Sequence, residues 1–229
     1  MINFAPTIHK GDVIAVGDIH GRFDLLDELC DHVADTGASV IFLGDLIDRG
    51  PQDLEVLDRV HYMMMSPESW GLESVTALMG NHEWMFIDAA TGPASSVRLW
   101  MENGGNFEAY ADMLRHLPWI QRLPIFVTIR DTLFIHAGFY PGKDPAETIQ
   151  AGRKENILWM REPFLTMGPM FDKWNKSLKK VVFGHTPQSA LPYTIPGGGI
   201  CIDTGAFHTG ILTTYNATQN TFWSYDNDA

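Results

Sequence analysis

Short apolar runs alternate with amphipathic segments along the first 90 residues of the chain. The runs Val13–Val16, Val40–Leu43 and Val75–Met79 have the length and composition of buried strands. The segments between them carry apolar residues at helical spacing, at Leu25, Leu26, Leu29 and Val33 and then at Leu54, Leu57, Val60 and Met64. This alternation of strand and helix predicts parallel strands joined by right-handed crossovers.

The residues that flank these segments indicate where helices begin. Pro51 stands where a first helical position is expected, because proline lacks the amide hydrogen that this position leaves unpaired. A third helix is predicted from Asn81 to about Ala90. In parallel α/β sheets, ligands bind beyond the carboxyl ends of the strands, so a site is expected in the loops that follow the three runs.

The pattern changes between residues 91 and 123, which we call the cap segment. It contains Trp100 and the tripeptide Asn103-Gly104-Gly105 among several Met and Leu residues. We expect helices around a Gly-rich turn, forming a possible helical cap over the site. Trp100, Phe107 and Tyr110 could line a substrate cleft, but a helical core is the expected place for most of them.

Strand patterns return at Ile125. Phe126–Ile129 and Leu133–Ile135 flank a short polar turn and predict a hairpin. Further apolar runs follow at Val181–Phe183, Ile200–Ile202, Ile211–Tyr215 and Phe222–Tyr225, after an irregular stretch from Tyr140 to Lys180. We therefore expect an α/β protein, in which a parallel α/β half precedes a largely antiparallel half within one domain over residues 1–229.

Six turns at strand ends contain a glycine beside a side chain that can bind a metal ion. They are Gly17-Asp18-Ile19-His20-Gly21, Gly44-Asp45-Leu46-Ile47-Asp48-Arg49-Gly50, Gly80-Asn81-His82-Glu83, His136-Ala137-Gly138, Gly184-His185-Thr186-Pro187 and Asp203-Thr204-Gly205. Each turn by itself is weak evidence, because Asp and Gly are common wherever a strand turns. Their recurrence at the same structural position indicates one shared site.

Carboxylates combined with imidazoles favour Mn, Fe or Zn ions over Ca, which prefers oxygen ligands. Asp18 and His20 can bind one ion from a single turn, and Asp45 can bridge two ions because a carboxylate has two oxygens. The second ion could be completed by Asn81, His136 and His185. Two such ions, about 4 Å apart, would lower the pKa of a bridging water and generate hydroxide at neutral pH.

Two arginines fit the binding of a phosphate group. Arg49 follows Asp45 by four residues, and Arg161 lies in the irregular stretch. A guanidinium group can donate to two phosphate oxygens at once. The alternative for Arg161 is a surface ion pair with Glu162 or Glu155.

His82 directly follows Asn81 and must therefore point elsewhere in the same turn. It could protonate a leaving alkoxide, with Asp48 holding its imidazole and favouring the charged form. The alternative is a histidine at a helix start that makes only a local cap.

Composition limits the classes of partner. The chain has 229 residues, 45% of them hydrophobic, and a formal net charge of −12. Such a charge argues against binding to nucleic acids and to anionic membranes. It would also repel a phosphorylated substrate, so metal cations and arginines must offset it locally.

Further features of the sequence concern the cellular compartment of the protein. Cys30 and Cys201 lie far apart and are expected to be reduced. Met1 to Lys10 lacks the pattern of a secretory signal, and no apolar run reaches membrane-spanning length. We expect a cytoplasmic protein, and the sequence does not indicate its oligomeric state.

The turns from Gly17–Gly21 to Gly184–Pro187 resemble the signature of the phosphoprotein phosphatase family of metallophosphoesterases. The segments Trp100–Gly105 and Trp159–Glu162 make the chain most similar to the bacterial and phage lambda-type members. This resemblance implies a two-sheet β-sandwich core flanked by helices, the calcineurin-like metallophosphoesterase fold.

The resemblance also implies roles for individual residues. Metal 1 would be held by Asp18, His20 and Asp45, and metal 2 by Asp45, Asn81, His136 and His185. Arg49 and Arg161 would bind the phosphate, and Asp48 with His82 would form the proton-donating dyad. Hydroxide bound to two metal ions, usually Mn²⁺ in bacterial members, would attack directly without a phosphoenzyme.

Local details favour one branch of the family. Pro187 occupies the position of the second His in the G-H-x-H motif of related nucleases and cyclic-nucleotide phosphodiesterases. Asp48 and Glu83 distinguish the chain from the related symmetrical dinucleoside tetraphosphatases, which usually lack the dyad Asp and carry G-N-H-D. His136-Ala137-Gly138 departs from the His-Gly-Gly of eukaryotic relatives, so regulatory partners of that kind are in doubt.

The leading hypothesis is a phosphatase for phosphoserine or phosphothreonine in proteins or peptides, with phosphotyrosine as a further option. The alternative is a symmetrical dinucleoside tetraphosphatase or another nucleotide hydrolase. A non-catalytic binding module is disfavoured, because it would be expected to have lost at least one ligand or dyad residue.

Overall fold

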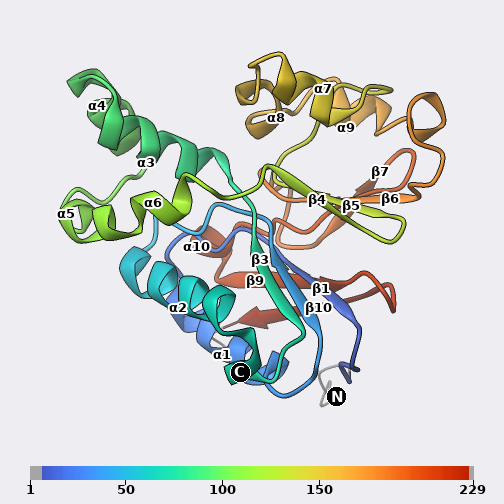
Figure 1. The fold of residues 1–229 in the computed structure, drawn as a ribbon, viewed down its shortest axis with the longest axis horizontal. Helices are drawn as coiled ribbons and strands as arrows, with labels where there is room; N and C mark the ends of the chain where they lie inside the picture. The colour runs from blue at the N-terminus through green and yellow to red at the C-terminus, as the bar shows by residue number, and fades with distance from the viewer. Residues whose placement is uncertain (1–6, 227–229) are drawn as a thin grey trace.

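Ten strands form two five-stranded sheets in the computed structural model, which describes residues 7–226 (Figure 1). The first sheet has the strand order β10-β9-β1-β2-β3. Its strands are β1 (Val13–Val16), β2 (Ser39–Phe42), β3 (Ser74–Ala77), β9 (Ile211–Asn216) and β10 (Thr221–Asp226). Strands β1, β2 and β3 are parallel, as predicted, while β9 and β10 add an antiparallel pair beside β1.

The second sheet has the order β4-β5-β6-β8-β7. Its strands are β4 (Phe126–Ile129), β5 (Thr132–Ile135), β6 (Lys180–Phe183), β7 (Tyr193–Ile195) and β8 (Gly199–Cys201). The expectation of a largely antiparallel second half was wrong for the inner strands, because β5, β6 and β8 run parallel to one another. Only the outer pairs β4–β5 and β7–β8 are antiparallel. Long connections from β5 to β6, and from β6 by way of β7 to β8, make room for the crossovers that parallel neighbours need.

Helices α1 (Phe23–Val33) and α2 (Asp53–Met65) cover the outer face of the first sheet (Figure 1). The expectation that Pro51 opens the second helix was wrong. The amide of Gln52 donates to the carbonyl of Gly21, so the chain is still in a loop there and the helix begins at Asp53. Helix α3 (Asn81–Thr91) begins where it was predicted.

In Figure 1, α3 and the helices of the cap segment lie to the left of the two sheets, while the helices between β5 and β6 lie above the second sheet and pack on its outer face. The cap segment contains α4 (Ala94–Glu102), α5 (Tyr110–Met113), the 3-10 turn η2 (Leu114–His116) and α6 (Leu117–Ile120). The stretch expected to be irregular contains short helices α7 (Pro145–Gln150), α8 (Glu155–Leu158), α9 (Phe164–Met167) and the 3-10 turn η3 (Phe171–Lys173). Two other short elements are η1 (Pro67–Trp70) and α10 (Ala206–Thr209).

Apolar side chains on alternate strand positions build two different cores. In β2, Ile41 faces the second sheet, while Phe42 faces the helices. In β5, Phe134 faces the first sheet, while Leu133 and Ile135 contact the helical side. Each central strand is therefore buried on both faces, as expected for sheets covered on both sides. This layering confirms the predicted β-sandwich flanked by helices.

Within residues 7–226, every helix is too short or too polar to cross a bilayer. The expectation about a secretory signal in Met1 to Lys10 falls mostly outside these described residues.

We expect Phe134→Ala to lower the free energy of unfolding by about 3–5 kcal/mol, because it empties space between the two sheets. The control is Phe222→Ala, whose ring is 41% exposed and which should cost less than about 1 kcal/mol. Urea unfolding followed by circular dichroism measures both values. Equal losses would show that Phe134 is not at a tightly packed junction.

Candidate active site

The carboxyl ends of the parallel strands of both sheets meet at one rim. Asp18 follows β1, Asp45 follows β2, and Asn81 follows β3. From the second sheet, His136 follows β5, and His185 follows β6. The parallel direction of β5 and β6, which the sequence analysis missed, is what brings the last two side chains to the same rim as the first three.

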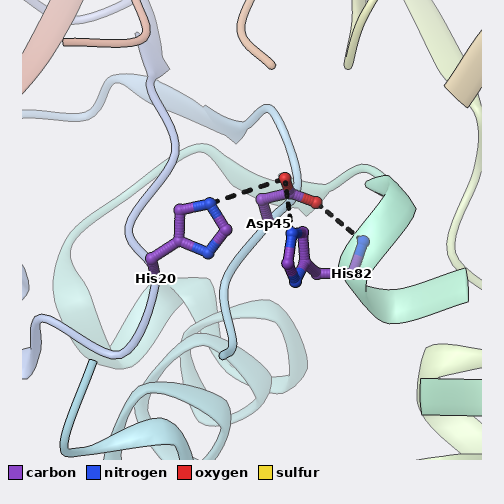
Figure 2. Close-up of side chains that lie close together, drawn as sticks. All are labelled: His20, Asp45 and His82. Atoms are coloured by element: carbon purple, nitrogen blue, oxygen red, sulfur yellow. Dashed lines mark hydrogen bonds and ion pairs between the residues drawn. The ribbon is translucent and has the colours of Figure 1, made fainter. Parts of the chain in front are cut away.

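Asp45 lies between two groups of side chains that can hold a metal ion. In one group, potential ligand atoms of His20, Asp45 and His82 all lie within 4.8 Å of one another (Figure 2). In the other, those of Asp45, His136 and His185 do so. The Asp45 Oδ2 atom is 3.6 Å from Nε2 of His20 and 3.4 Å from Nε2 of His136. Asp45 therefore has the position expected of a bridging carboxylate.

Carbonyl groups orient two of these imidazoles. Nδ1 of His20 donates to the carbonyl of Ile47 at 2.8 Å, and Nδ1 of His136 donates to that of Leu43 at 3.0 Å. This arrangement leaves Nε2 of both rings near Asp45, where Nε2 of His20 also accepts from Nη1 of Arg49. An outer carbonyl partner is common for metal-binding histidines.

The predicted second-metal ligands also face one another. Oδ1 of Asn81 is 2.8 Å from Nδ1 of His185 and 3.0 Å from Nε2 of His136. Nε2 of His185 is buried and has no hydrogen-bond partner among residues 7–226. Convergent nitrogen and oxygen donors of this kind suit a divalent transition ion.

Asp18 is placed differently from the other ligand candidates. Its carboxylate accepts from the backbone amide of His185, with the shorter distance 3.0 Å to Oδ2, and it is hydrogen-bonded to Asp203. It thus reaches the rim from β1, but it contacts the His185 backbone rather than the imidazole of His20. Asp203, from the sixth turn, received no role in the sequence analysis.

Two glycines leave room for the carboxylates. A Cβ atom on Gly80 would lie 2.2 Å from Oδ1 of Asp45, and one on Gly184 would lie 2.0 Å from Oδ1 of Asp18. Neither position can accept a side chain without displacing a carboxylate. The glycines of these turns are therefore explained by close packing against the site.

Burial controls the charge of these groups. It lowers the pKa of His20 to about 3 and that of His185 to about 2, so both imidazoles are neutral at pH 7. Burial would raise the pKa of Asp45, but nearby His136 and His82 lower it well below its usual range. Neutral imidazoles at His20 and His185 beside an ionised Asp45 are protonation states that bind a cation. At His136, burial is outweighed by the Asp45 carboxylate, which raises the pKa of that imidazole.

His82 and Asp48 form a buried pair. Nδ1 of His82 is 2.7 Å from Oδ2 of Asp48, and both side chains are inaccessible to solvent. Nε2 of His82 is buried 4.0 Å from Oδ2 of Asp45 and has no hydrogen-bond partner in the part of the chain that the structure describes. Asp48 lies within hydrogen-bonding distance of the imidazole, as expected, but burial lowers the pKa of His82 to about 4, because desolvation outweighs the effect of the Asp45 carboxylate. That Asp48 favours the charged ring stays a prediction.

Three residues support this arrangement through hydrogen bonds that the sequence did not predict. Glu83 accepts from the backbone amides of Asp45 and Leu46 at 2.8 Å each, which fixes the loop after β2. Asp53 accepts from the amide of Asp48 at 2.8 Å. Trp100 lies in the buried core, the place expected for most aromatic residues of the cap segment, and its indole also donates to the Asp48 carboxylate. Local spacing carries no signal for these contacts, since two of them join residues more than 35 positions apart.

A cleft of about 710 Å³ opens over the two groups, between the cap segment and the segment from Trp159 to Arg161. Arg49 and Arg161 both line it, together with Glu102 and Phe207. Among the described residues, Arg161 forms no ion pair with Glu155 or Glu162, so the surface alternative was wrong.

Arg49 lies beside the imidazole of His20. Its Nη1 atom is 2.9 Å from Nε2 of His20, and its guanidinium lies 4.9 Å from the centre of the Phe207 ring. Arg161 donates to the carbonyl of His185 at 3.5 Å. Both predicted phosphate-binding arginines therefore border the same cleft as the proposed metal ligands.

Comparisons with known proteins agree with this architecture. The profile of the calcineurin-like phosphoesterase family matches residues 11–216. The serine/threonine-protein phosphatase 1 of Salmonella typhimurium is 33% identical over 222 residues, covering 88% of this chain and 89% of that protein. The symmetrical bis(5'-nucleosyl)-tetraphosphatase of Bordetella pertussis is 31% identical over 185 residues, covering 78% of this chain and 58% of that protein.

A solved structure described as a candidate diadenosine tetraphosphatase has a TM-score of 0.62 at 21% identity, covering 98% of this chain and 97% of that chain. The expected fold is confirmed. The names of these relatives cover two substrate classes, which the similarities do not separate.

We expect Mn²⁺, at about 100 times its Kd, to raise the free energy of unfolding of the chelator-treated protein by about 2.7 kcal/mol, because only the folded chain assembles the ligands. Asp45→Asn should lose most of this increment. Asp172→Asn, at a side chain that is 69% exposed, should keep it. Denaturant unfolding with and without Mn²⁺ measures the increment, and an unchanged increment in Asp45→Asn would remove Asp45 from the ligand set.

Proposed function

This chain belongs to the calcineurin-like phosphoesterase family, and from that membership we propose that it is a metal-dependent phosphomonoesterase acting on phosphoserine or phosphothreonine in proteins. The observation that carries the proposal is the shared position of Asp45 between two donor groups, beneath a cleft bordered by two arginines. Phosphotyrosine is a further substrate within the same chemistry.

Two divalent cations, Mn²⁺ being the first choice, would be held by side chains from both sheets. One would take Asp18, His20 and Asp45, and the other Asp45, Asn81, His136 and His185. The neutral imidazoles and the partnerless Nε2 of His185 support this assignment. When bound, the cations supply Lewis acidity at the phosphoryl group and lower the pKa of the attacking water.

The arginines would orient the phosphate. Arg161 reaches the cleft from the segment that follows α8, while Arg49 reaches it from the loop that follows β2. Two guanidinium groups bordering one cleft can hold the equatorial oxygens of a phosphate. Phe207 packs against Arg49 and limits its freedom.

His82 would donate a proton to the leaving oxygen. Its partnerless Nε2 atom is the one free to do so, because Nδ1 is engaged by Asp48. The dianionic phosphate would supply negative charge that favours the protonated ring, which burial otherwise disfavours. The proton would then pass from Nε2 to the departing alkoxide, with Asp48 holding the ring in place.

Charge favours one phosphate group over several. The cleft is lined by the cations of Arg49 and Arg161, while Glu102 adds a negative charge. A tetraphosphate chain would need further cationic contacts for the phosphates beyond the reacting one. A symmetrical dinucleoside tetraphosphatase therefore remains the second candidate, supported by the 31% identity to such an enzyme.

The whole chain would act as one catalytic domain, with the cap segment as a helical cover. The cap segment contributes Asn103 and Gly104 to the cleft lining. Cys30 and Cys201 are buried free thiols, which suits the reducing cytoplasm.

Hydrolysis of p-nitrophenyl phosphate and of phosphoserine peptides should be abolished by chelation and restored by Mn²⁺. Diadenosine tetraphosphate, tested in parallel with analysis of the products, should be hydrolysed at least about tenfold less efficiently, because two arginines serve one phosphate. Preference for the dinucleotide would favour the second candidate. Inactivity on all three substrates with every divalent ion would contradict the proposal.

His82→Asn should lower kcat on phosphoserine peptides by about 10²–10⁴-fold, the usual contribution of a general acid. The affinity for Mn²⁺, measured by calorimetry, should change by less than about threefold. The control His208→Asn changes a histidine outside the lining of the cleft and should leave both quantities unchanged. Parallel losses of turnover and Mn²⁺ affinity would reassign His82 to a ligand role.

A further inference from the structure

The Asp48 carboxylate is held from two directions. Oδ2 faces Nδ1 of His82 at 2.7 Å. The indole Nε1 of Trp100 donates to the same carboxylate, at 2.8 Å to Oδ1 and 3.0 Å to Oδ2. Within residues 7–226, these are the side chains that contact it by hydrogen bonds, and all three are buried with no exposed surface.

The backbone at Asp48 is in a strained conformation and is held by hydrogen bonds other than those of its side chain. Asp48 and Arg49 have φ values of 71° and 70°, in the left-handed region that non-glycine residues rarely adopt. The Asp48 amide donates to Oδ1 of Asp53, and the Arg49 amide donates to the carbonyl of Gly104 at 2.8 Å. These bonds hold a turn that directs one side chain toward His82 and the next toward the cleft.

The Trp100 ring has no room to rotate. It contacts the rings of Phe86 and Tyr110, with centres 5.7 Å and 5.3 Å away. A Cβ atom on Gly105 would lie 2.3 Å from the indole, so the backbone of the Gly-rich turn packs directly on the ring. The indole N–H is therefore presented to Asp48 in one orientation.

We propose that Trp100 and Asp53 are positioning residues for the proton donor. Trp100 fixes the carboxylate of Asp48 and Asp53 fixes its backbone, so that Nδ1 of His82 stays engaged and Nε2 faces the cleft. This inference rests on the proposed function, in which His82 protonates the leaving oxygen. Neither residue lines the phosphate cleft, so both act through Asp48.

A purely structural role for Trp100 makes a different prediction. Loss of packing would slow the hydrolysis of every substrate alike. If the proton donor loses its orientation, the loss of rate would depend on the leaving group. p-Nitrophenolate leaves with little help, whereas a serine alkoxide needs a proton. The ratio of the two rates therefore separates the two roles.

The test compares Trp100→Phe, which keeps an aromatic ring but lacks the N–H group, with the native protein loaded with Mn²⁺. We expect kcat for a phosphoserine peptide to fall about 10- to 100-fold, part of the usual general-acid contribution. The loss on p-nitrophenyl phosphate should be about tenfold smaller, with little change in KM. The matched control is Trp119→Phe, since the indole N–H of Trp119 is buried in the same segment without a partner.

A double-mutant cycle tests whether the effect of Trp100 on turnover acts through His82. In the His82→Asn background, Trp100→Phe should cause no further loss on the phosphoserine peptide, because both changes act on one step. Asp53→Ala provides a second variant if Trp100→Phe does not fold, and it should show the same dependence on the leaving group.

Equal losses of kcat on the two substrates, or additive losses in the double-mutant cycle, would overturn the positioning role of Trp100 and Asp53. In that case the native protein would still hydrolyse both substrates and the proposed function would stand. Inactivity of the native protein on both substrates would overturn the proposed function and this inference with it.

Discussion

The buried Asp45 carboxylate is the group around which both sheets are arranged. A buried charge is costly unless hydrogen bonds or opposite charges surround it. Imidazoles from the ends of β1 and β5 approach its oxygens, and the amide of His82 donates to it at 3.0 Å. Each partner comes from a different turn, so the carboxylate can be accommodated only when the two sheets are packed with their strand ends at one rim.

Much of this arrangement could be predicted because its signals are local. Apolar runs such as Val13–Val16 and Val181–Phe183 are short and buried on both faces, so their composition identifies them as strands. The turn after each run must pass close to a carboxylate, which explains why glycine recurs at Gly80 and Gly184. Local spacing in the sequence therefore predicts both the strands and the candidate ligands.

The features that could not be predicted depend on contacts between distant segments. The direction of β6 and β8 is set by packing and by long connections, which leave no mark in the strands themselves. The bond from Trp100 to Asp48 joins residues 52 positions apart, and a buried tryptophan has the same pattern whether or not its N–H is used. The late start of α2, at Asp53 instead of Pro51, follows from a bond between Gln52 and Gly21.

The strand order has a consequence for biosynthesis. Strand β1 lies between β2 and β9, so one edge of the N-terminal strand stays open until residues beyond 210 have been made. A nascent chain that has emerged only as far as the cap segment holds an incomplete first sheet and lacks His136 and His185, which complete the second donor group beside Asp45. That donor group is therefore assembled only after β6 has been synthesised and has paired with β5.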